Sequence, residues 1–305
     1  MSKMRNTYTI DNDVNFVNEM SHKNEPETSL NITVDVRQYP SMFEVYDAFE
    51  HMFKTHYFIL GNGFENVMKN VLLALKPKTM GWVTPTWGML DVYCEALNIT
   101  SVNKSFEYKD NRFVHPNFND EIDVFYTTYS FNNLFKHTNI NLNSIKSTYN
   151  IVDVSYLPLK KIKKMTKRNN DKTIIIGSFD KIYGCGVRLG FAIYPKHLHN
   201  DIQLQREQYI NSIAEEIILN NYTPRYTWYN KVKKILPENS IISYNYVTIP
   251  YEYNGSEYHK TFTLSGKIFT RFGMPYNKRT YNKLEDIING LERSKKIILF
   301  NERMG

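Results

Sequence analysis

Between residues 57 and 195, short apolar runs rich in β-branched residues alternate with longer segments whose apolar residues have helical spacing. We expect strands, one of them running into a turn at Gly61-Asn62-Gly63, at 57–63, 80–85, 123–130, 149–159, 172–179 and 186–195. We expect helices at 40–53, 64–76 and 86–97. This alternation is typical of an α/β protein with a mostly parallel sheet covered by helices.

The pattern changes after residue 198. Helical spacing dominates 199–221, 223–236 and 281–294, with strand-like segments at 240–253, 260–266 and 267–273 between them. Such a mixture predicts a smaller α+β domain. We therefore expect a large domain at 41–200, a small domain at 201–305, and an arm at 1–40 that joins the small domain. The first thirty residues are polar, which favours a loosely held segment.

Composition excludes several classes of protein. The chain of 305 residues is 42% hydrophobic and 23% charged, which is typical of a globular protein. Its polar start and the lack of a long apolar run predict a cytoplasmic protein with no membrane span. Cys94 and Cys185 supply neither a disulfide framework nor metal-ligand spacing, and the eight His residues show no metal pattern. The net charge of +7 favours anionic partners, although Lys-rich coding alone would produce it.

Polar residues gather where the predicted strands end. Ligands of an open α/β sheet bind beyond the carboxyl ends of its strands. Those positions hold Gly61, Asn62, Gly63, Asn132, Asp153, Tyr156, Ser178 and Lys181, with Arg188 nearby in sequence. Glycine amides, a hydroxyl and a guanidinium suit a phosphate, and a partly dry lysine can attack an aldehyde. A carboxylate can hold a pyridinium proton, while Asn and Tyr can bind a phenolate oxygen. Together these are the recognition groups for pyridoxal 5′-phosphate (PLP).

The segment "SFDKIYGCGVRLGF", residues 178–191, carries a specific resemblance. It is similar to the "SxSKxxGLxGxRxGY" segment of fold-type I PLP-dependent enzymes, in particular the histidinol-phosphate aminotransferase group. The resemblance implies a three-layer α/β/α large domain with a mostly parallel sheet and a reduced α+β small domain. It also implies that Lys181 is the Schiff-base lysine and that Ser178 and Arg188 bind the cofactor phosphate.

Further motifs follow in the family's order. "VDVSY" resembles the strand end "DEAY", which implies that Asp153 binds the pyridine nitrogen and Tyr156 the phenolate oxygen. "TYSFNN" stands where the family has "NPNNPTG", which suggests Asn132 for the same oxygen. "LGNGFEN" resembles "GNGSDE", which assigns the phosphate-binding amides to Gly63, Phe64 and Glu65.

Two more motifs concern the ring and the subunit interface. "TPTWGMLDVYCEAL" resembles "PTYxMYxxxA" and puts Trp87 where an aromatic ring stacks on the cofactor. "RQYPS" resembles "RYPD", whose tyrosine reaches the phosphate of the neighbouring subunit. The resemblance therefore implies a homodimer in which Tyr39 crosses the interface.

The chain also departs from the family. Asp180 stands where the family usually has Ser or Thr. Beside a phosphate its carboxylate would repel the ligand and raise its own pKa, unless it points away or pairs with a basic group. The segment between Lys181 and Arg188 is one residue shorter than in many relatives, and the "NPTG" turn is absent. Arg271 in "KIFTRFG" is the nearest candidate for binding a substrate carboxylate.

Three functions remain open on these grounds. The first is an aminotransferase that acts on a small amino donor and an oxo acceptor. The second is a PLP-dependent decarboxylase or other lyase, whose amino acid substrate could be attached to a nucleobase, as in enzymes that hypermodify phage DNA. The third is a degenerate, non-catalytic relative that binds an anionic partner, for which Asp180 is the best support. The basic run at 157–172 is either a solvated face or a contact for such an anion; it does not by itself support nucleic acid binding.

Overall fold

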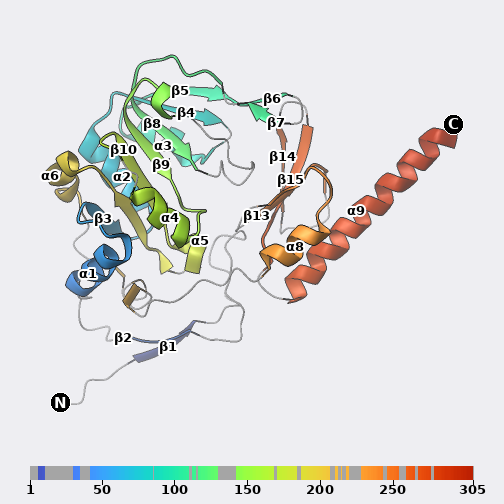
Figure 1. Cartoon of the computed structure of the whole chain (residues 1–305), viewed down its shortest axis with the longest axis horizontal. Coiled ribbons are helices and arrows are strands. Elements are labelled where there is room, and N and C mark those ends of the chain that lie inside the picture. The colour runs from blue at the N-terminus through green and yellow to red at the C-terminus, as the bar shows by residue number, and fades with distance from the viewer. Residues whose placement is uncertain are drawn as a thin grey trace.

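A computed structural model describes residues 6–10, 30–34, 42–84, 86–109, 112–114, 116–129, 142–167, 170–183, 187–206, 210–211, 214, 218–219, 228–242, 246–253, 259–264, 267–275 and 278–304. The largest sheet has seven strands in the order β3-β11-β10-β9-β8-β4-β5 (Figure 1). They are β3 Phe58–Gly61, β11 Gly190–Ile193, β10 Thr173–Ser178, β9 Ser147–Asp153, β8 Ile122–Thr128, β4 Thr79–Thr84 and β5 Thr100–Ser105. All pairs are parallel except the two made by β11, which runs antiparallel to β3 and β10.

Helices cover both faces of this sheet because its central strands are apolar on both sides. Along β10, Ile175 packs in one core cluster and Ile174 and Ile176 in another. The first cluster includes residues of α1 (Met42–Phe53) and α4 (Leu159–Thr166). The second includes residues of α2 (Phe64–Leu75), α3 (Met89–Ala96) and α6 (His199–Gln203). The predicted three-layer α/β/α architecture is therefore confirmed.

A second, four-stranded antiparallel sheet lies toward the C-terminus, in the order β12-β13-β15-β14. Its strands are β12 Ile241–Ile242, β13 Tyr246–Ile249, β15 Lys267–Gly273 and β14 His259–Leu264. The helices α8 (Tyr229–Ile235) and α9 (Lys278–Met304) follow the pattern predicted for this region. Their apolar residues form one core with the sheet: Trp228, Val232, Val247, Ile249, Phe272, Met274, Leu284 and Ile288. In Figure 1 the C-terminal half of α9 extends away from both sheets.

Several elements differ from the sequence-based prediction. Of the helix expected at 199–221, the described residues show α6, which ends at Gln203, and helical residues at Ala214, Ile218 and Leu219. Leu204, directly after α6, lies in a turn and is 81% exposed. The last helix is longer than predicted, since α9 begins at Lys278. Within the segment expected to be loose, β1 (Asn6–Ile10) pairs with β2 (Leu30–Val34).

Small strands at the edges were also missed. The side chains of β5 are mostly exposed and polar, so its sequence lacks the apolar signal of the central strands. The hairpin of β6 (Glu107–Lys109) and β7 (Arg112–Val114) has only three residues in each strand. In the described part of the chain, no helix combines the length and the apolar character needed to cross a membrane.

Gly190 permits a close approach between two strands at the edge where the site lies. It pairs with Gly61, and a Cβ atom on Gly190 would lie 2.3 Å from the carbonyl oxygen of Gly63. Because the obstacle is backbone, we expect Gly190→Ala to lower the free energy of unfolding by about 1–3 kcal/mol. Gly290 in α9 has no atom within 4 Å of its Cβ position, so Gly290→Ala is expected to raise that free energy by roughly 0.5–1 kcal/mol. Urea unfolding of both variants measures the contrast, and equal midpoints would contradict the close approach.

Candidate functional site

The carboxyl ends of the parallel strands meet at one edge of the seven-stranded sheet. Ser178, at the end of β10, pairs with Gly190, which in turn pairs with Gly61 at the end of β3. Asp153, at the end of β9, pairs with Thr128 at the end of β8. Because β11 is antiparallel, its start and the preceding Arg188 also lie at this edge. The topology therefore brings the candidate residues at the ends of separate strands to one edge of the sheet.

Asp153 is buried, with 5% of its surface exposed. Its Oδ2 accepts a hydrogen bond from the Tyr126 hydroxyl at 2.8 Å, and its Oδ1 accepts one from the Ser155 N–H at 2.8 Å. The Thr128 hydroxyl donates to the Tyr126 hydroxyl at 3.5 Å. Burial raises the pKa of Asp153, whereas these hydrogen bonds and the positive charge of Lys181 oppose that rise. A carboxylate held in this way suits a positively charged N–H donor.

Lys181 lies in α5 (Asp180–Tyr183), a single turn that follows β10 directly. The side chain is half-buried. Its positive charge opposes the rise that burial causes in the pKa of both Asp153 and Asp180. The turn is shaped by Ser178, whose Oγ accepts a hydrogen bond from the Asp180 N–H at 3.0 Å. The turn after β10 thus puts Lys181 at the same edge of the sheet as Asp153, which ends the neighbouring strand β9.

A cradle for an anion lies where α2 begins. Gly63 precedes α2 with a φ of 95°, a conformation that L side chains rarely adopt. A Cβ at this position would lie 2.7 Å from Nη2 of Arg188, so the guanidinium packs directly against the Cα of Gly63. The first amides of a helix have no acceptor within the helix. Together with Arg188 and the Ser178 hydroxyl, the amides of Phe64 and Glu65 form a donor set that suits a phosphate.

Asp180, whose direction the sequence left open, turns toward Arg188. The Nη1 of Arg188 lies 3.4 Å from Oδ2 of Asp180, and the Leu189 N–H donates to Oδ1 at 3.3 Å. Asp180 is buried, whereas Arg188 is half exposed and has a φ of 46°. Burial raises the pKa of Asp180, and the charge of Arg188 opposes this.

The remaining predicted residues form two aromatic contacts beside the edge. The ring of Trp87 meets that of Phe64 edge-on at 4.9 Å, which places Trp87 at the start of α2. Tyr93 connects α3 to the first turn of α2, because its hydroxyl donates to the carbonyl oxygen of Glu65 at 3.0 Å. Trp87 thus packs directly against the cradle.

The second aromatic contact reaches the smaller sheet. The ring of Tyr156 lies 5.5 Å from that of Tyr246 in β13. The guanidinium carbon of Arg271 lies 4.8 Å from the centre of the same Tyr246 ring. Arg271 is therefore connected to Tyr156, and hence to the end of β9, through a single tyrosine.

Two predicted site residues are not described by the structure, and two residues near the site were not predicted from the sequence. Tyr39 and Asn132 lie outside the described residues, so their assigned roles stay predictions. Tyr126 and Asn211 were missed. Asn211 donates from Nδ2 to the carbonyl oxygens of Val187 (3.0 Å) and Arg188 (3.2 Å) and fixes the approach to β11. A phenol within the buried run of β8 was the one local sign that Tyr126 is special.

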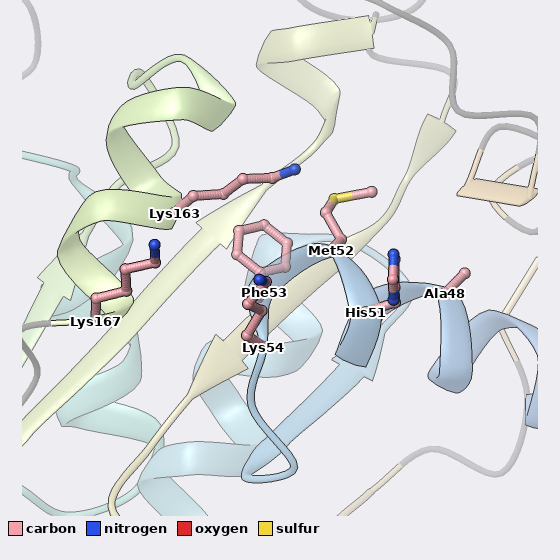
Figure 2. A pocket seen from close by; sticks show the side chains of 7 residues that line it. All are labelled: Ala48, His51, Met52, Phe53, Lys54, Lys163 and Lys167. Carbon is pink, nitrogen blue, oxygen red and sulfur yellow. The ribbon is translucent and has the colours of Figure 1, made fainter.

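Part of the basic run at 157–172 forms the helix α4. Between α4 and α1 lies a pocket of about 360 Å³ (Figure 2). It is lined by Ala48, His51, Met52, Phe53, Lys54, Lys163 and Lys167. Figure 2 shows Lys163 and Lys167 coming from the α4 side of the pocket and the other labelled residues from the α1 side. The pocket shares no residue with the site at the strand ends.

The sequence matches no protein-family model and no curated protein. Its structure is similar to that of a histidinol-phosphate aminotransferase from Clostridium acetobutylicum, with a TM-score of 0.62, 14% identity, and coverage of 84% of this chain and 91% of that chain. An L-threonine-O-3-phosphate decarboxylase from Porphyromonas gingivalis gives a TM-score of 0.62, 12% identity, and coverage of 85% and 91%. A PLP-bound C-S lyase from Staphylococcus hominis gives 0.50, 14%, and 69% of each chain. The chain therefore has the fold of the fold-type I PLP-dependent enzymes, and the fold that the resemblance implies is confirmed.

Proposed function

We propose that the chain binds PLP at the strand-end site and acts as an aminotransferase on a small amino donor and an oxo acceptor. The observation that carries this proposal is the arrangement of opposite chemistries around Lys181. The buried carboxylate of Asp153 lies on one side, and the cradle of Gly63 and Arg188 lies at the same sheet edge. PLP has a basic ring nitrogen and a phosphate at different positions of one rigid ring, so this donor and acceptor set fits it.

Each residue then has a defined task. The amides of Phe64 and Glu65, the Ser178 hydroxyl and the Arg188 guanidinium hold the phosphate. The N–H of Gly63, which the resemblance also assigned to it, donates to the carbonyl oxygen of Gly61 at 2.8 Å. Trp87 contacts the face of the ring, and Tyr156 and Asn132 bind the phenolate oxygen. Tyr39 of a second copy completes the phosphate site, which makes the functional unit a homodimer.

When bound, PLP supplies a ring that withdraws electrons from the carbon bearing the substrate amino group. Asp153 keeps a proton on the ring nitrogen, because a buried carboxylate strongly favours a cationic partner. Lys181 would hold the aldehyde of the cofactor, and its free amine would be the base that accepts the proton from the substrate Cα. Arg271 orients the substrate by binding its carboxylate, on the side of the site reached through Tyr246.

The same residues also permit a decarboxylase, which is the second candidate. The decarboxylase from Porphyromonas gingivalis and the aminotransferase from Clostridium acetobutylicum give equal TM-scores with this chain, so the fold favours neither reaction. The bond that breaks depends on how the substrate is oriented at Cα. Conversion of the bound cofactor to its amine form by an amino acid indicates transamination, whereas release of CO₂ without that conversion indicates decarboxylation.

Reduction with borohydride tests the cofactor assignment. We expect protein incubated with PLP and then reduced to carry a pyridoxyl group on the peptide that contains Lys181, as measured by mass spectrometry. Lys181→Ala should lose this label. Lys196→Ala, which removes an exposed lysine just after β11, should keep it. Label spread evenly over surface lysines, or absent from Lys181, would overturn the proposal.

A further inference from the structure

Two of the groups assigned to the phosphate already contact Asp180. Arg188 forms an ion pair with its Oδ2 at 3.4 Å, and the Ser178 hydroxyl accepts a hydrogen bond from its N–H at 3.0 Å. The Leu189 N–H, at 3.3 Å from Oδ1, supplies a further donor. The carboxylate of Asp180 therefore satisfies Arg188 much as a phosphate oxygen would.

The charges around Asp180 make a second anion unfavourable. In the described residues, the cations whose charges act on Asp180 are Arg188 and Lys181. Glu65, in the first turn of the neighbouring α2, is exposed. With Asp180 ionised, Arg188 is already neutralised, so an entering phosphate dianion meets a buried like charge. Such repulsion is poorly screened where water is excluded.

We propose that Asp180 and the phosphate of the cofactor compete for Arg188, and that Asp180 takes up one proton from solvent when the phosphate binds. This inference rests on the proposed function. Once protonated, the carboxyl group can donate a hydrogen bond as a Ser or Thr hydroxyl would at this position. The cofactor affinity of this chain therefore falls as the pH rises.

The pKa of Asp180 supports the same direction. Burial already raises it, and the charge of Arg188 is the largest opposing effect. When a phosphate engages Arg188, that opposing effect weakens and a negative charge is added nearby. Both changes raise the pKa further, so phosphate binding and protonation of Asp180 favour each other.

The test uses pyridoxamine 5′-phosphate, because its amine cannot form an imine with Lys181 and its binding reports non-covalent contacts alone. Fluorescence titrations between about pH 5.5 and pH 8.5 compare wild type, Asp180→Asn and Asp180→Ser. Above the pKa of Asp180, wild-type affinity should fall relative to Asp180→Asn by up to about tenfold per pH unit. Comparing variants cancels the ionisation of the ligand itself. At about pH 8 Asp180→Asn should bind roughly tenfold or more tightly than wild type.

Two controls isolate the phosphate and the position. Pyridoxamine, which lacks the phosphate, should bind wild type and Asp180→Asn equally at every pH. Asp171→Asn removes the same charge from an exposed residue just before β10, at the opposite end of that strand, and should behave as wild type. Calorimetry in two buffers of different ionisation enthalpy should show about one more proton taken up by wild type than by Asp180→Asn.

Equal affinities and equal pH dependence for wild type and both Asp180 variants would overturn this inference. If Lys181 is still labelled by PLP and borohydride in that case, the proposed function stands and only the role of Asp180 is wrong. If no protein binds pyridoxamine 5′-phosphate and Lys181 takes no label, both fail together. If circular dichroism shows that Asp180→Asn does not fold, Asp180→Ser replaces it in the comparison with wild type.

Discussion

Lys181→Ala is expected to lower the rate of reaction at the substrate Cα by about 10²–10⁴-fold, the usual contribution of a positioned general base. The reason is the position of the residue: α5 follows β10 and carries Lys181 at the sheet edge where Asp153 ends the neighbouring strand. Exchange of the Cα proton for deuterium, followed by NMR over a panel of amino acids, measures proton removal. Release of CO₂ from the same panel measures the decarboxylase alternative.

Chemical rescue separates a lost base from a damaged fold. A small amine such as ethylamine should restore part of the exchange rate in Lys181→Ala and leave wild type unchanged. Lys196→Ala should keep the wild-type rate with or without the amine. If Lys181→Ala without added amine exchanges as fast as Lys196→Ala, the base is another group.

The large sheet could be predicted because its central strands are buried on both faces. Ile174, Ile175 and Ile176 are all buried, and a continuous β-branched run of this kind is typical of a strand that is covered on both faces. The edge strand β5 could not be predicted in the same way, since a strand with one neighbour and mostly exposed side chains has a polar sequence. The end of α6 at Gln203 was not predicted, because the next residue, Leu204, is apolar in the sequence although it is 81% exposed in the structure.

The candidate site divides along similar lines. Ser178, Lys181 and Arg188 were found because one short segment holds all three in a recognisable order. Tyr126 was missed because its hydrogen bond to Asp153 joins two residues that lie 27 apart in sequence, on neighbouring strands. The pairing of Asp180 with Arg188 required the direction of a side chain at the end of a strand, which spacing along the chain does not supply.

Asp153→Asn is expected to have opposite effects on catalysis and on stability. Turnover should fall by about 10²–10³-fold, because the neutral amide no longer holds a proton on the ring nitrogen where negative charge develops. The amide oxygen of Asn can still accept from the Ser155 N–H, and its NH₂ group can donate to the Tyr126 hydroxyl oxygen, so the local packing is kept. Deuterium exchange at Cα, measured as for Lys181→Ala, reports this loss.

The free energy of unfolding of the cofactor-free protein should increase in Asp153→Asn, because the pKa of Asp153 is raised in the folded state. Burial raises the pKa of Asp153 above its value in the unfolded chain. The folded state is therefore stabilised by Asp153 below the unfolded pKa, and that stabilisation is lost as the pH rises through the folded pKa. Asn does not titrate, so Asp153→Asn should be more stable than wild type at about pH 8, with the difference shrinking as the pH falls toward about 4.

Urea unfolding at several pH values measures this difference, and Tyr126→Phe is the matched control. That variant keeps the carboxylate but removes the hydroxyl at 2.8 Å, so it should be less stable than wild type by about 1–3 kcal/mol at neutral pH. If the carboxylate of Asp153 lowers the free energy of unfolding of the cofactor-free protein but raises turnover, its role is to supply negative charge to the site. If Asp153→Asn proves less stable than wild type by the same amount at every pH, Asp153 is a structural hydrogen-bond acceptor and the ring nitrogen has another partner.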